Sequence, residues 1–328
     1  MNMKDIAVKC GVSVSTVSRV INRKPGVNPK MREQIQKIID ENGFRPNQIA
    51  KNLLSSKSEN IGVVLPMVHS YFTKRIMAVT EVCQKNNYGV MMVNNYYSQK
   101  NILNSIYSLY EKRVDGILYF ESICGKEQTA ALKEINKKIP IVLVDQELPE
   151  SEIPCVVQDN YNGSRKATEY LIEKGHRKLL YISGPSYDWG ANLRKKAFTD
   201  VLKKNGIDSS CIREGKFSLN SGYKIAKEVI QENNDITAVF CANDDMAIGA
   251  IAAIKDLNLN IPEDISVIGF DDIDMANYIK PRLSTVRQDH YGIGEKATEL
   301  LIDIIKNKKA KIKKIYMDYE LIIRESTN

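Results

Sequence analysis

The sequence has little of what marks secreted, membrane-spanning or metal-dependent proteins. Its six cysteines stand thirty or more residues apart with no C-x-x-C pair, so reduced core thiols are expected rather than disulfides or a zinc site. No stretch approaches the roughly 20 apolar residues that a membrane span needs, and the N-terminus has no apolar signal segment. We therefore expect a cytoplasmic protein with neither a membrane nor a metal partner.

Side chains suited to catalysis are also scarce. The three histidines, His69, His176 and His290, show no ligand spacing and no paired nucleophile, so no catalytic residue is predicted and an enzyme is not expected. The segment 292–297, G-I-G-E-K-A, matches a dinucleotide-binding fingerprint. About twenty residues later, however, the chain is rich in lysine and offers no well-placed ribose carboxylate. The sequence accordingly predicts no cofactor.

The net charge is unevenly distributed along the chain. The whole chain carries +7, with 47 Lys and Arg against 40 Asp and Glu. Residues 1–58 hold 11 of the basic and 4 of the acidic side chains, which leaves 36 of each sign in residues 59–328. All of the excess therefore lies in the first sixth of the chain, as expected for a small nucleic-acid-binding headpiece on a neutral body.

Residues 2–22 have the pattern of two short helices joined by a tight turn. The side chain of Asn2 can cap the first helix while Asp5 reaches back to it, and Gly11 can end that helix where a positive φ costs little. Ser13 then caps a second helix. A helical hairpin of any function shows these signals, but the arrangement also fits a DNA-binding helix-turn-helix.

The second helix has one apolar face and one face of small, mostly polar side chains. Val17, Val20 and Ile21 recur at helical spacing and are expected to be buried. The outer face then holds Val14, Ser15, Thr16, Ser18 and Arg19. Short hydroxyls, one small apolar group and one Arg fit a major groove without steric blockage, and they can bond to bases and phosphates. We expect this helix to read DNA.

Two further helical segments follow. Asn28, with proline after it, marks the start of a third helix that Gly43 ends, which predicts a headpiece over residues 1–45. The stretch P-N-Q-I-A-K-N-L-L-S-S has a cap at Asn47 but only about two turns of helix, so it should order only against a partner. Residues 46–59 are therefore predicted to be a hinge helix and linker.

From residue 60 the pattern changes to short apolar runs that alternate with amphipathic helical segments. The runs include I-G-V-V-L, Y-G-V-M-M-V, P-I-V-L-V-D and I-S-V-I-G-F-D. Continuous Val, Ile and Leu strands separated by helices indicate parallel sheets covered on both faces. Residues 60–328 are thus predicted to form an α/β body of two doubly wound lobes, with a single eight-unit α/β barrel as the alternative.

Taken in order, several motifs resemble the lac repressor family of bacterial transcription regulators. They are D-I-A-x-x-x-G-V-S-x-x-T-V-S-R-V-I-N, F-R-P-N-Q-I-A-K-N-L-L, A-N-D-D-M-A-I-G-A, D-I-S-V-I-G-F-D-D and L-S-T-V-R-Q-D. The resemblance implies an all-α helix-turn-helix headpiece and an effector-binding and dimerisation body of periplasmic-binding-protein type I architecture. The N-terminal lobe would take about residues 60–158 and 290–317, and the C-terminal lobe about 159–289 and 318–328.

The resemblance also implies which residues contact DNA. Those that would read base edges or position the second helix on phosphates are Val14, Ser15, Thr16, Ser18, Arg19 and Asn22. Those that the hinge would add are Asn47, Ala50, Leu53 and Leu54. Arg19 is the residue able to make a bidentate contact with guanine. Leu53 occupies the place of the leucine that wedges into the minor groove, but Leu54 departs from the family's pattern, so either leucine is a candidate for the wedge.

In the body, the resemblance places an effector between the two lobes at the carboxyl ends of the strands. The residues implied to contact it are Phe72, Asp145, Asp188, Trp189, Arg194, Phe217, Asn243, Asp271 and His290. Arg194 and Asp271, expected from opposite sides, would suit vicinal hydroxyls. Phe72 and Phe217 would stack on a sugar ring, with ordinary core packing as the alternative. The expected effector is therefore a sugar.

Together these expectations describe a DNA-binding transcription regulator, taken to be a repressor. It would bind a near-palindromic double-stranded operator as a homodimer, under the control of a small sugar-like effector. One alternative is a solute-binding or sensor module of the same body fold that responds to a nucleoside or purine, or that acts through a protein co-effector. Another is an enzyme on the same α/β scaffold, which would need a nucleophile and a base that the sequence does not offer.

Overall fold

The computed structural model divides the chain into two compact units, Met1–Ser58 and Glu59–Asn328. The residues that the structure describes are 1–44, 58–66, 70–94, 99–123, 125–148, 151–207, 211–307 and 314–328. Cys124, His69 and the predicted hinge residues lie outside these ranges, the hinge residues being Asn47, Ala50, Leu53 and Leu54. In the part of the chain that is described, no helix is both long and apolar enough to cross a membrane.

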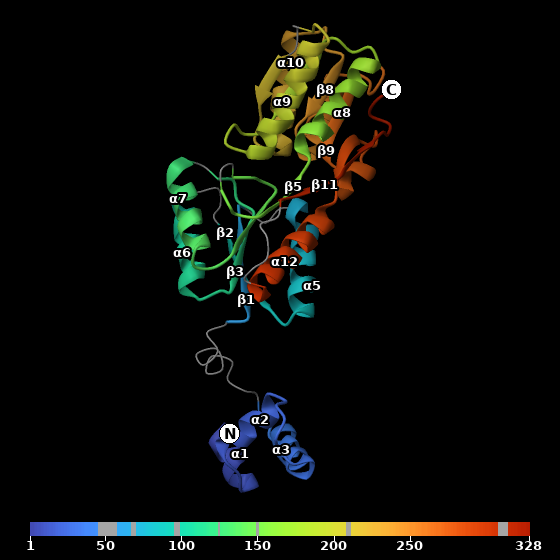
Figure 1. Ribbon diagram of the computed structural model, residues 1–328. Helices are drawn as coiled ribbons and strands as arrows, with labels where there is room; N and C mark the ends of the chain where they lie inside the picture. The colour runs from blue at the N-terminus through green and yellow to red at the C-terminus, as the bar shows by residue number, and fades with distance from the viewer. Residues whose placement is uncertain are drawn as a thin grey trace. The chain divides into compact units, whose positions relative to one another are not determined.

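The first unit contains a three-helix headpiece, shown in blue in Figure 1. Helix α1 spans Met3–Cys10, α2 spans Val14–Ile21 and α3 spans Pro29–Glu41. One apolar core joins the three helices, and its buried members are Ile6, Ala7, Cys10, Val17, Val20 and Ile35. The buried face predicted for the second helix is therefore confirmed at Val17 and Val20, while Ile21 is half-buried.

The local signals at the helix ends act as predicted. The Asn2 side chain accepts hydrogen bonds from the first turn of α1, and the Asp5 carboxylate accepts one from the backbone N–H of Asn2 at 2.7 Å. Gly11 adopts the left-handed conformation, with φ of 67°, and ends α1. The Ser13 hydroxyl then accepts from the N–H of Thr16 and caps α2. This turn fixes how α2 is presented, because both helix ends are satisfied by their own neighbours.

The second unit contains two six-stranded sheets. The first is parallel throughout, in the order β11-β5-β4-β3-β1-β2. Its strands are β1 (Asn60–Leu65), β2 (Gly89–Asn94), β3 (Gly116–Tyr119), β4 (Ile141–Val144), β5 (Cys155–Gln158) and β11 (Lys314–Met317). Its helices are α5 (Ser70–Lys85), α6 (Gln99–Glu111), α7 (Gly125–Asn136) and α12 (His290–Lys306). We call this sheet and its helices the N-terminal lobe.

The second sheet has the order β12-β10-β9-β8-β6-β7, with β12 antiparallel to β10. Its strands are β6 (Leu179–Ser183), β7 (Cys211–Glu214), β8 (Ala238–Cys241), β9 (Ser266–Asp271), β10 (Ser284–Gln288) and β12 (Tyr319–Ile322). Its helices are α8 (Asn160–Glu173), α9 (Trp189–Lys204), α10 (Leu219–Glu232), α11 (Asp244–Asp256) and a 3-10 turn at Asp274–Asn277. We call this part the C-terminal lobe. Two separate sheets confirm the predicted fold class and exclude the single barrel.

The N-terminal lobe is a three-layer sandwich. Figure 1 shows α6 and α7 on one side of the sheet and α5 with α12 on the other. Alternation along the strands explains the layers: Val63 and Leu118 pack with α5 and α12, whereas Val64 and Ile117 pack with α6 and α7. Strands buried on both faces must be apolar at every position, and this is the continuous pattern seen in the sequence.

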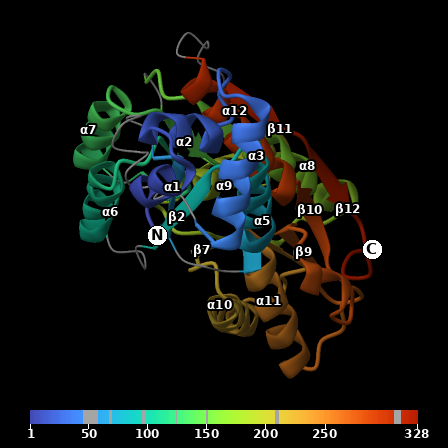
Figure 2. The same cartoon turned by 90° about the horizontal axis from the view of Figure 1, so that it is seen from below.

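The C-terminal lobe repeats this design around one large apolar core. Within it α8 lies beside α9 and α10 beside α11, and Figure 2 shows the latter pair side by side. The chain passes between the two sheets directly after β5, after β10 and after β11. Consequently the strand-like run from Ile315 to Arg324 is shared between two sheets, with Asp318 between β11 and β12.

The segment that matched a dinucleotide fingerprint lies inside α12 and forms no phosphate-binding turn. Gly294 instead allows α12 to approach α5 closely, since a Cβ atom there would lie 2.3 Å from the carbonyl oxygen of Arg75. The five cysteines in the described ranges are free, and all but Cys211 are buried. Arg75 is therefore held at the contact between two helices of the N-terminal lobe.

Candidate functional site

The outer face of α2 presents the side chains predicted to meet DNA. Val14 is 39% exposed although it is apolar, and Ser15, Arg19 and Asn22 are exposed as well. Thr16 and Ser18, also predicted to contact DNA, are half-buried. An exposed Val on a helix whose other valines are buried is the kind of contact that a thymine methyl group can make.

Arg19 and the serines are engaged locally, which sets their positions. One Arg19 terminal nitrogen donates to the carbonyl oxygen of Pro25 at 3.1 Å, so the guanidinium lies over the loop that follows α2. The Ser13 hydroxyl bonds both Ser15 Oγ and Thr16 Oγ1, at 2.8 and 2.9 Å. Exposed contacts of this type exchange readily for contacts with a ligand, because each is worth little in water.

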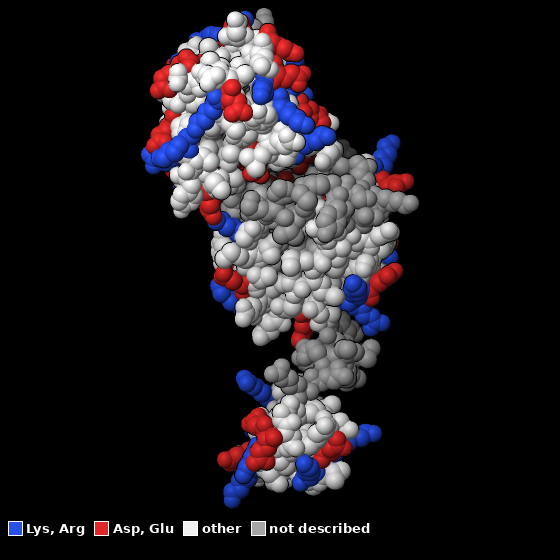
Figure 3. All heavy atoms as spheres, turned by 180° about the vertical axis from the view of Figure 1, so that it is seen from behind, with Lys and Arg blue, Asp and Glu red and all other residues white. Residues whose placement is uncertain are grey.

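Charged side chains of both signs project from the surface of the headpiece. Figure 3 shows Lys and Arg side chains projecting from the headpiece, with Asp and Glu between them. The excess of Lys and Arg over Asp and Glu in residues 1–58 supplies an attraction for phosphates that does not depend on sequence. The small side chains on the outer face of α2 are those predicted to discriminate between sequences.

A cavity of about 130 Å³ lies between the two lobes of the body, and we call it the interlobe cavity. From the N-terminal lobe its lining residues are Pro66, Tyr71, Phe72, Arg75, Phe120, Glu121, Ser122, Val144, Asp145 and Gln146. From the C-terminal lobe they are Tyr187, Asp188, Trp189, Gly190, Arg194, Phe217, Asn243, Asp245 and Asp271. These residues follow the carboxyl ends of strands or begin the next helices, where α/β folds bind ligands.

The predicted effector residues come together at this cavity with one exception. All of them except His290 are among its lining residues. His290 is buried behind the wall, with Nε2 bonded to the carbonyl oxygen of Asp271 at 2.8 Å and Nδ1 accepting from Arg75 Nε at 3.4 Å. Burial and the Arg75 charge lower the pKa of His290 to about 3, so the ring is neutral and supports its neighbours.

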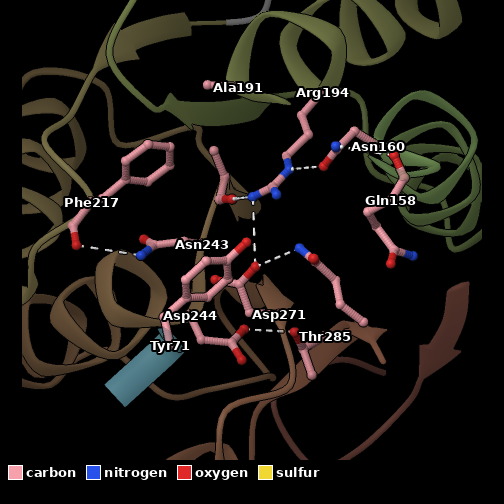
Figure 4. A network of polar contacts seen from close by, with 12 residues as sticks. Tyr71, Gln158, Asn160, Ala191, Arg194, Phe217, Asn243, Asp244, Asp271 and Thr285 are labelled. Carbon is pink, nitrogen blue, oxygen red and sulfur yellow. Dashed lines mark hydrogen bonds and ion pairs between the residues drawn. The ribbon is translucent and has the colours of Figure 1, made fainter. Parts of the chain in front are cut away.

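The placement of Arg194 and Asp271 differs from the prediction. Both belong to the C-terminal lobe, on α9 and at the end of β9, so they do not approach from opposite sides. Arg194 Nη1 lies 3.7 Å from Asp271 Oδ1, and Figure 4 shows the guanidinium between Asp271 and Asn160. The same guanidinium donates to Asn160 Oδ1 at 2.7 Å and to the carbonyl oxygen of Ala242 at 2.5 Å.

Sequence reasoning missed Arg75, an arginine of the cavity wall that is fully buried. It donates to Asp145 at 2.9 Å and to Tyr71 Oη at 2.6 Å, both in its own lobe. It also donates to Gln288 Oε1 at 3.0 Å, and Gln288 in turn donates to Asp271 Oδ1 at 2.8 Å. A continuous polar chain therefore links Asp145 of one lobe to Asp271 of the other.

A signal for Arg75 was present in the sequence. On α5 it lies three residues after Phe72 and four before Val79, which places it on the buried face of that helix. A charged side chain in such a position must have a partner, because burying an unpaired charge costs far more than burying a polar group. The partners themselves are distant in sequence, so the pattern shows that a pair exists but not which one.

A second set of contacts joins the lobes at the start of α9. Asp188 caps α9 by accepting from the N–H of Ala191 at 2.7 Å, and its other oxygen accepts from Ser122 Oγ of the N-terminal lobe at 3.1 Å. Trp189, the first residue of α9, packs against the apolar cluster of the N-terminal lobe. Asp188 and Trp189 therefore contact the opposite lobe as well as lining the cavity.

The two phenylalanines predicted to stack on a ring serve the core as well. Phe72 is 8% exposed and packs edge-on against Tyr71 and Phe120. Phe217 packs so closely on Gly184 that a Cβ atom there would lie 2.2 Å from its ring. Both rings still line the cavity, so core packing and ligand contact are compatible roles at these positions.

Three non-glycine residues of the same wall have a strained backbone. Asp145, Phe217 and Asp271 have φ values of 62°, 53° and 122°, in the region that L-residues rarely occupy. Asn243 helps to hold this geometry, since its side chain caps α11 and donates to the carbonyl oxygen of Phe217 at 3.3 Å. Strained non-glycine residues persist where the surrounding structure holds them, typically at ligand sites.

The carboxyl groups of the cavity differ in their pKa values. Burial pushes the pKa of Asp145 upward, but the Arg75 charge and the Tyr71 hydrogen bond outweigh it and lower that pKa to about 2. Burial raises the pKa of Asp271 to about 7 although Arg194 and Arg75 oppose it. Asp244, behind Asp271, has its pKa raised well above the usual range by burial and by the Asp271 charge. The wall thus combines Asp145, which stays ionised, with Asp271, which titrates near neutral pH.

Chemically, this arrangement suits recognition of a small polar molecule. Carboxylate and amide oxygens accept hydrogen bonds, guanidinium groups donate them, and aromatic rings offer flat apolar surfaces within one enclosed space. In the described ranges no group of three or more His, Cys, Asp or Glu side chains is placed to hold a metal ion. The cavity therefore has the chemistry of a binding site.

Comparison with known proteins places the chain among bacterial regulators. Residues 2–47 match the family model "Bacterial regulatory proteins, lacI family", and residues 168–327 match "Periplasmic binding protein-like domain". The ribose operon repressor of Haemophilus influenzae is 32% identical over 327 residues, covering 99% of this chain and 98% of that protein. The transcriptional repressor CytR of Escherichia coli is 32% identical over 328 residues, covering 99% and 96%.

Solved structures agree with these sequence relatives. A lac repressor dimer bound to operator and the anti-inducer ONPF has a TM-score of 0.92 at 26% identity, covering 100% of this chain and 99% of that one. A regulator of the same family from Enterococcus faecium with bound ribose has a TM-score of 0.74 at 27% identity, covering 82% and 98%. A complex of the regulator CelR with cellobiose has a TM-score of 0.76 at 26% identity, covering 99% of each chain.

Proposed function

Because the chain belongs to the lacI family of bacterial regulatory proteins and is a DNA-binding transcription regulator, we propose that it represses transcription under the control of a sugar-like effector. One observation carries the proposal. A single chain combines a helix-turn-helix whose reading face is exposed with a cavity lined by both lobes of a binding-protein fold. The helix-turn-helix would bind the operator, and the cavity would bind the effector that controls it.

The headpiece, residues 1–45, inserts α2 into the major groove of an operator. Val14, Ser15 and Arg19 read base edges, while Thr16, Ser18 and Asn22 position the helix on phosphates. Residues 46–59 form the hinge, in which Asn47, Ala50, Leu53 and Leu54 contact DNA. The protein acts as a homodimer, because two headpieces related by a two-fold axis match a near-palindromic operator. The lac repressor dimer bound to operator supports this arrangement.

The effector occupies the interlobe cavity of the body, residues 60–328. The effector-binding residues are Phe72, Asp145, Asp188, Trp189, Arg194, Phe217, Asn243 and Asp271, with His290 behind them. A polyhydroxylated ring fits this set, because its hydroxyls can both donate to carboxylates and accept from guanidinium groups while its C–H face packs on an aromatic ring. The ribose-bound and cellobiose-bound neighbours support a sugar.

Control of DNA binding follows from linkage between the two sites. An effector that contacts both lobes favours one lobe arrangement over others, and it shifts operator affinity by the difference in its affinity for those arrangements. The hydrogen bonds from Arg75 to Gln288 and from Ser122 to Asp188 belong to the arrangement described here. The protein has no catalytic role. It acts in the cytoplasm, where its operator lies.

The DNA-reading role of α2 is tested at Arg19. The full-length protein first selects its operator from a random duplex library, and affinities for the selected operator are then measured by fluorescence anisotropy. Replacing Arg19 by Ala should weaken specific binding by about 1–3 kcal/mol, which is the value of one bidentate contact with guanine. Binding to unrelated DNA should change much less.

Lys37→Ala is the matched control, since Lys37 is an exposed side chain on α3 that carries the same charge and pairs only loosely with Glu41 at 3.9 Å. It should weaken specific and non-specific binding equally and slightly, through the loss of one positive charge. Equal losses of specific affinity in the two variants would remove α2 from the reading role.

A further inference from the structure

The interlobe cavity has an unbalanced charge. Within the described ranges, the charged residues that line it are acidic residues and arginines, beside the phenols of Tyr71 and Tyr187. The acidic residues are Glu121, Asp145, Asp188, Asp245 and Asp271, and the arginines are Arg75 and Arg194. Carboxyl groups therefore outnumber guanidinium groups in an enclosed space, where charge interactions are stronger than in bulk water.

Both arginines already serve protein acceptors. Arg75 donates to Asp145, Tyr71 and Gln288, and its Nε contacts His290. Arg194 donates to the side chain of Asn160 and the carbonyl of Ala242, and it lies 3.7 Å from the carboxylate of Asp271. An incoming anion would have to compete with these bonds, and a phosphate ester would add roughly 1.5–2 negative charges beside the carboxylates. The cavity disfavours anionic ligands.

The surroundings of the carboxyl groups support the same conclusion. Burial raises the pKa of Asp188, and the charge of Asp145 adds to this effect. Burial likewise raises the pKa of Asp271 to about 7, with Asp145 and Asp245 acting in the same direction. For both carboxyls, burial outweighs the nearby arginine charges. A positive ligand would lower the cost of ionising them.

The aromatic walls also favour a cation. Tyr71, Phe72, Phe120, Trp189 and Phe217 all line the cavity. The face of an aromatic ring attracts a positive charge, and this wall already shows such a contact, with the Arg75 guanidinium 4.2 Å from the Tyr71 ring centre. Aromatic faces beside excess carboxylates form the usual protein environment for an ammonium group.

We propose that the effector is a cationic amino sugar, whose protonated amine lies against the carboxylates of Asp188, Glu121 or Asp245. The proposal rests on the sugar site proposed above and names the chemical class of its ligand. The amine replaces a ring hydroxyl, so the remaining hydroxyls keep the hydrogen bonds that any sugar would make. Neutral sugars of the same shape bind more weakly, and sugar phosphates bind least.

The experiment compares matched sugars on the full-length protein. Glucose, galactose and mannose are each paired with the 2-amino sugar of the same configuration, and glucose 6-phosphate is added as the anionic member. Thermal shift identifies binders and titration calorimetry measures their affinities at pH 7. The preferred amino sugar should bind at least about tenfold more tightly than its neutral parent, which corresponds to 1.4 kcal/mol.

Two variants locate the amine. Asp188→Asn removes the negative charge but keeps a good helix cap, so it should lower the ratio of amino-sugar affinity to neutral-sugar affinity, with both affinities measured on the variant. Asp256→Asn removes a carboxylate from the exposed end of α11 and should leave the preference unchanged.

The outcomes separate this inference from the function on which it rests. Neutral sugars or sugar phosphates binding as tightly as their amino counterparts would overturn the inference and keep the sugar site. Absence of binding by every amino sugar would overturn the inference as well. Amino-sugar binding that survives Arg194→Ala unchanged would move the site out of the cavity and overturn the proposed function itself.

Discussion

Asp271, which is buried, and Asp145, which is half-buried, are carboxyls of one cavity whose surroundings move their pKa values in opposite directions. Asp145 has its pKa lowered to about 2, because Arg75 and Tyr71 outweigh the effect of burial. Asp271 keeps a pKa of about 7, because burial outweighs the more distant Arg194. The guanidinium is closer in the first pair, 2.9 Å for Arg75 and Asp145 against 3.7 Å for Arg194 and Asp271. The Tyr71 hydrogen bond lowers the pKa of Asp145 further, and the charges of Asp145 and Asp245 raise that of Asp271.

The raised pKa of Asp271 predicts a pH dependence of stability. The folded state binds this proton more tightly than the unfolded state, so the stability that Asp271 contributes is complete below about pH 4 and is lost as the pH rises through about 7. Asp271→Asn is neutral at every pH. The melting temperature of the wild-type protein minus that of the variant should therefore fall between pH 4 and pH 8.

Taking the difference between two proteins is necessary because other groups titrate in the same range. The lowered pKa of His290 acts in the opposite direction, since the unfolded state takes up that proton first. Asp256→Asn controls for the general effect of removing a carboxylate. A wild-type minus Asp271→Asn difference that stays constant or rises over this range would show that the folded protein keeps Asp271 ionised, and it would contradict the raised pKa.

Among the elements, α5 is hydrogen-bonded to the segment where β10 ends and α12 begins, through Arg75, Gln288 and His290. No pattern in the sequence predicts these bonds. The helix caps at Asn2 and Ser13 could be predicted because their partners lie within three residues. The alternation of sheet and helix layers could be predicted because apolar residues recur with a different period in strands than in helices. Arg75 and Gln288 are 213 residues apart, and no local pattern pairs side chains at such a separation.

The same limit explains the error over Arg194 and Asp271. The sequence identified both residues and the family resemblance gave them a common site, but only the sheet order shows that α9 and β9 belong to the same lobe. Residues that do join the lobes include Arg75, Ser122 and Trp189. Eight of the 19 residues that line the cavity could be predicted from the sequence, whereas the pairing across the cavity could not.

Replacing Arg75 by Met should remove the hydrogen bonds that join α5 to Gln288 and His290. Met keeps most of the volume but leaves Asp145 buried without its charged partner, and breaking a buried pair in this way costs about 3–5 kcal/mol. The loss should appear as a lower denaturant midpoint for unfolding. Adding Asp145→Asn should restore part of it, since the double variant contains no unpaired charge.

Lys74→Met is the control for this prediction, because Lys74 is the next residue on α5 and pairs with Asp274 of the C-terminal lobe at 2.6 Å on the surface. Both partners are largely exposed, so its loss should cost less than about 1 kcal/mol. If Lys74→Met were as destabilising as Arg75→Met, the lobes would be joined at their surface and not through the buried network.

At the scale of the whole molecule, the basic DNA-binding part and the cavity lie in different units of the chain, as the charge distribution already indicated. The excess of basic side chains lies in residues 1–58, and the enclosed cavity lies in residues 59–328. Neither part alone is a regulator. The central claim is that binding in the interlobe cavity changes the affinity of α2 for an operator, which requires a coupling free energy between the two sites.

The most direct test is the affinity of the full-length protein for its selected operator, with and without a saturating amount of the sugar that gives the largest thermal shift. The account predicts that the sugar changes the operator Kd by about 5–150-fold, the usual range of such coupling, and that the operator changes the sugar's Kd by the same factor. Arg194→Ala should bind the operator but no longer respond to the sugar. An operator Kd that is the same with and without the sugar, or an undiminished response in Arg194→Ala, would contradict the account.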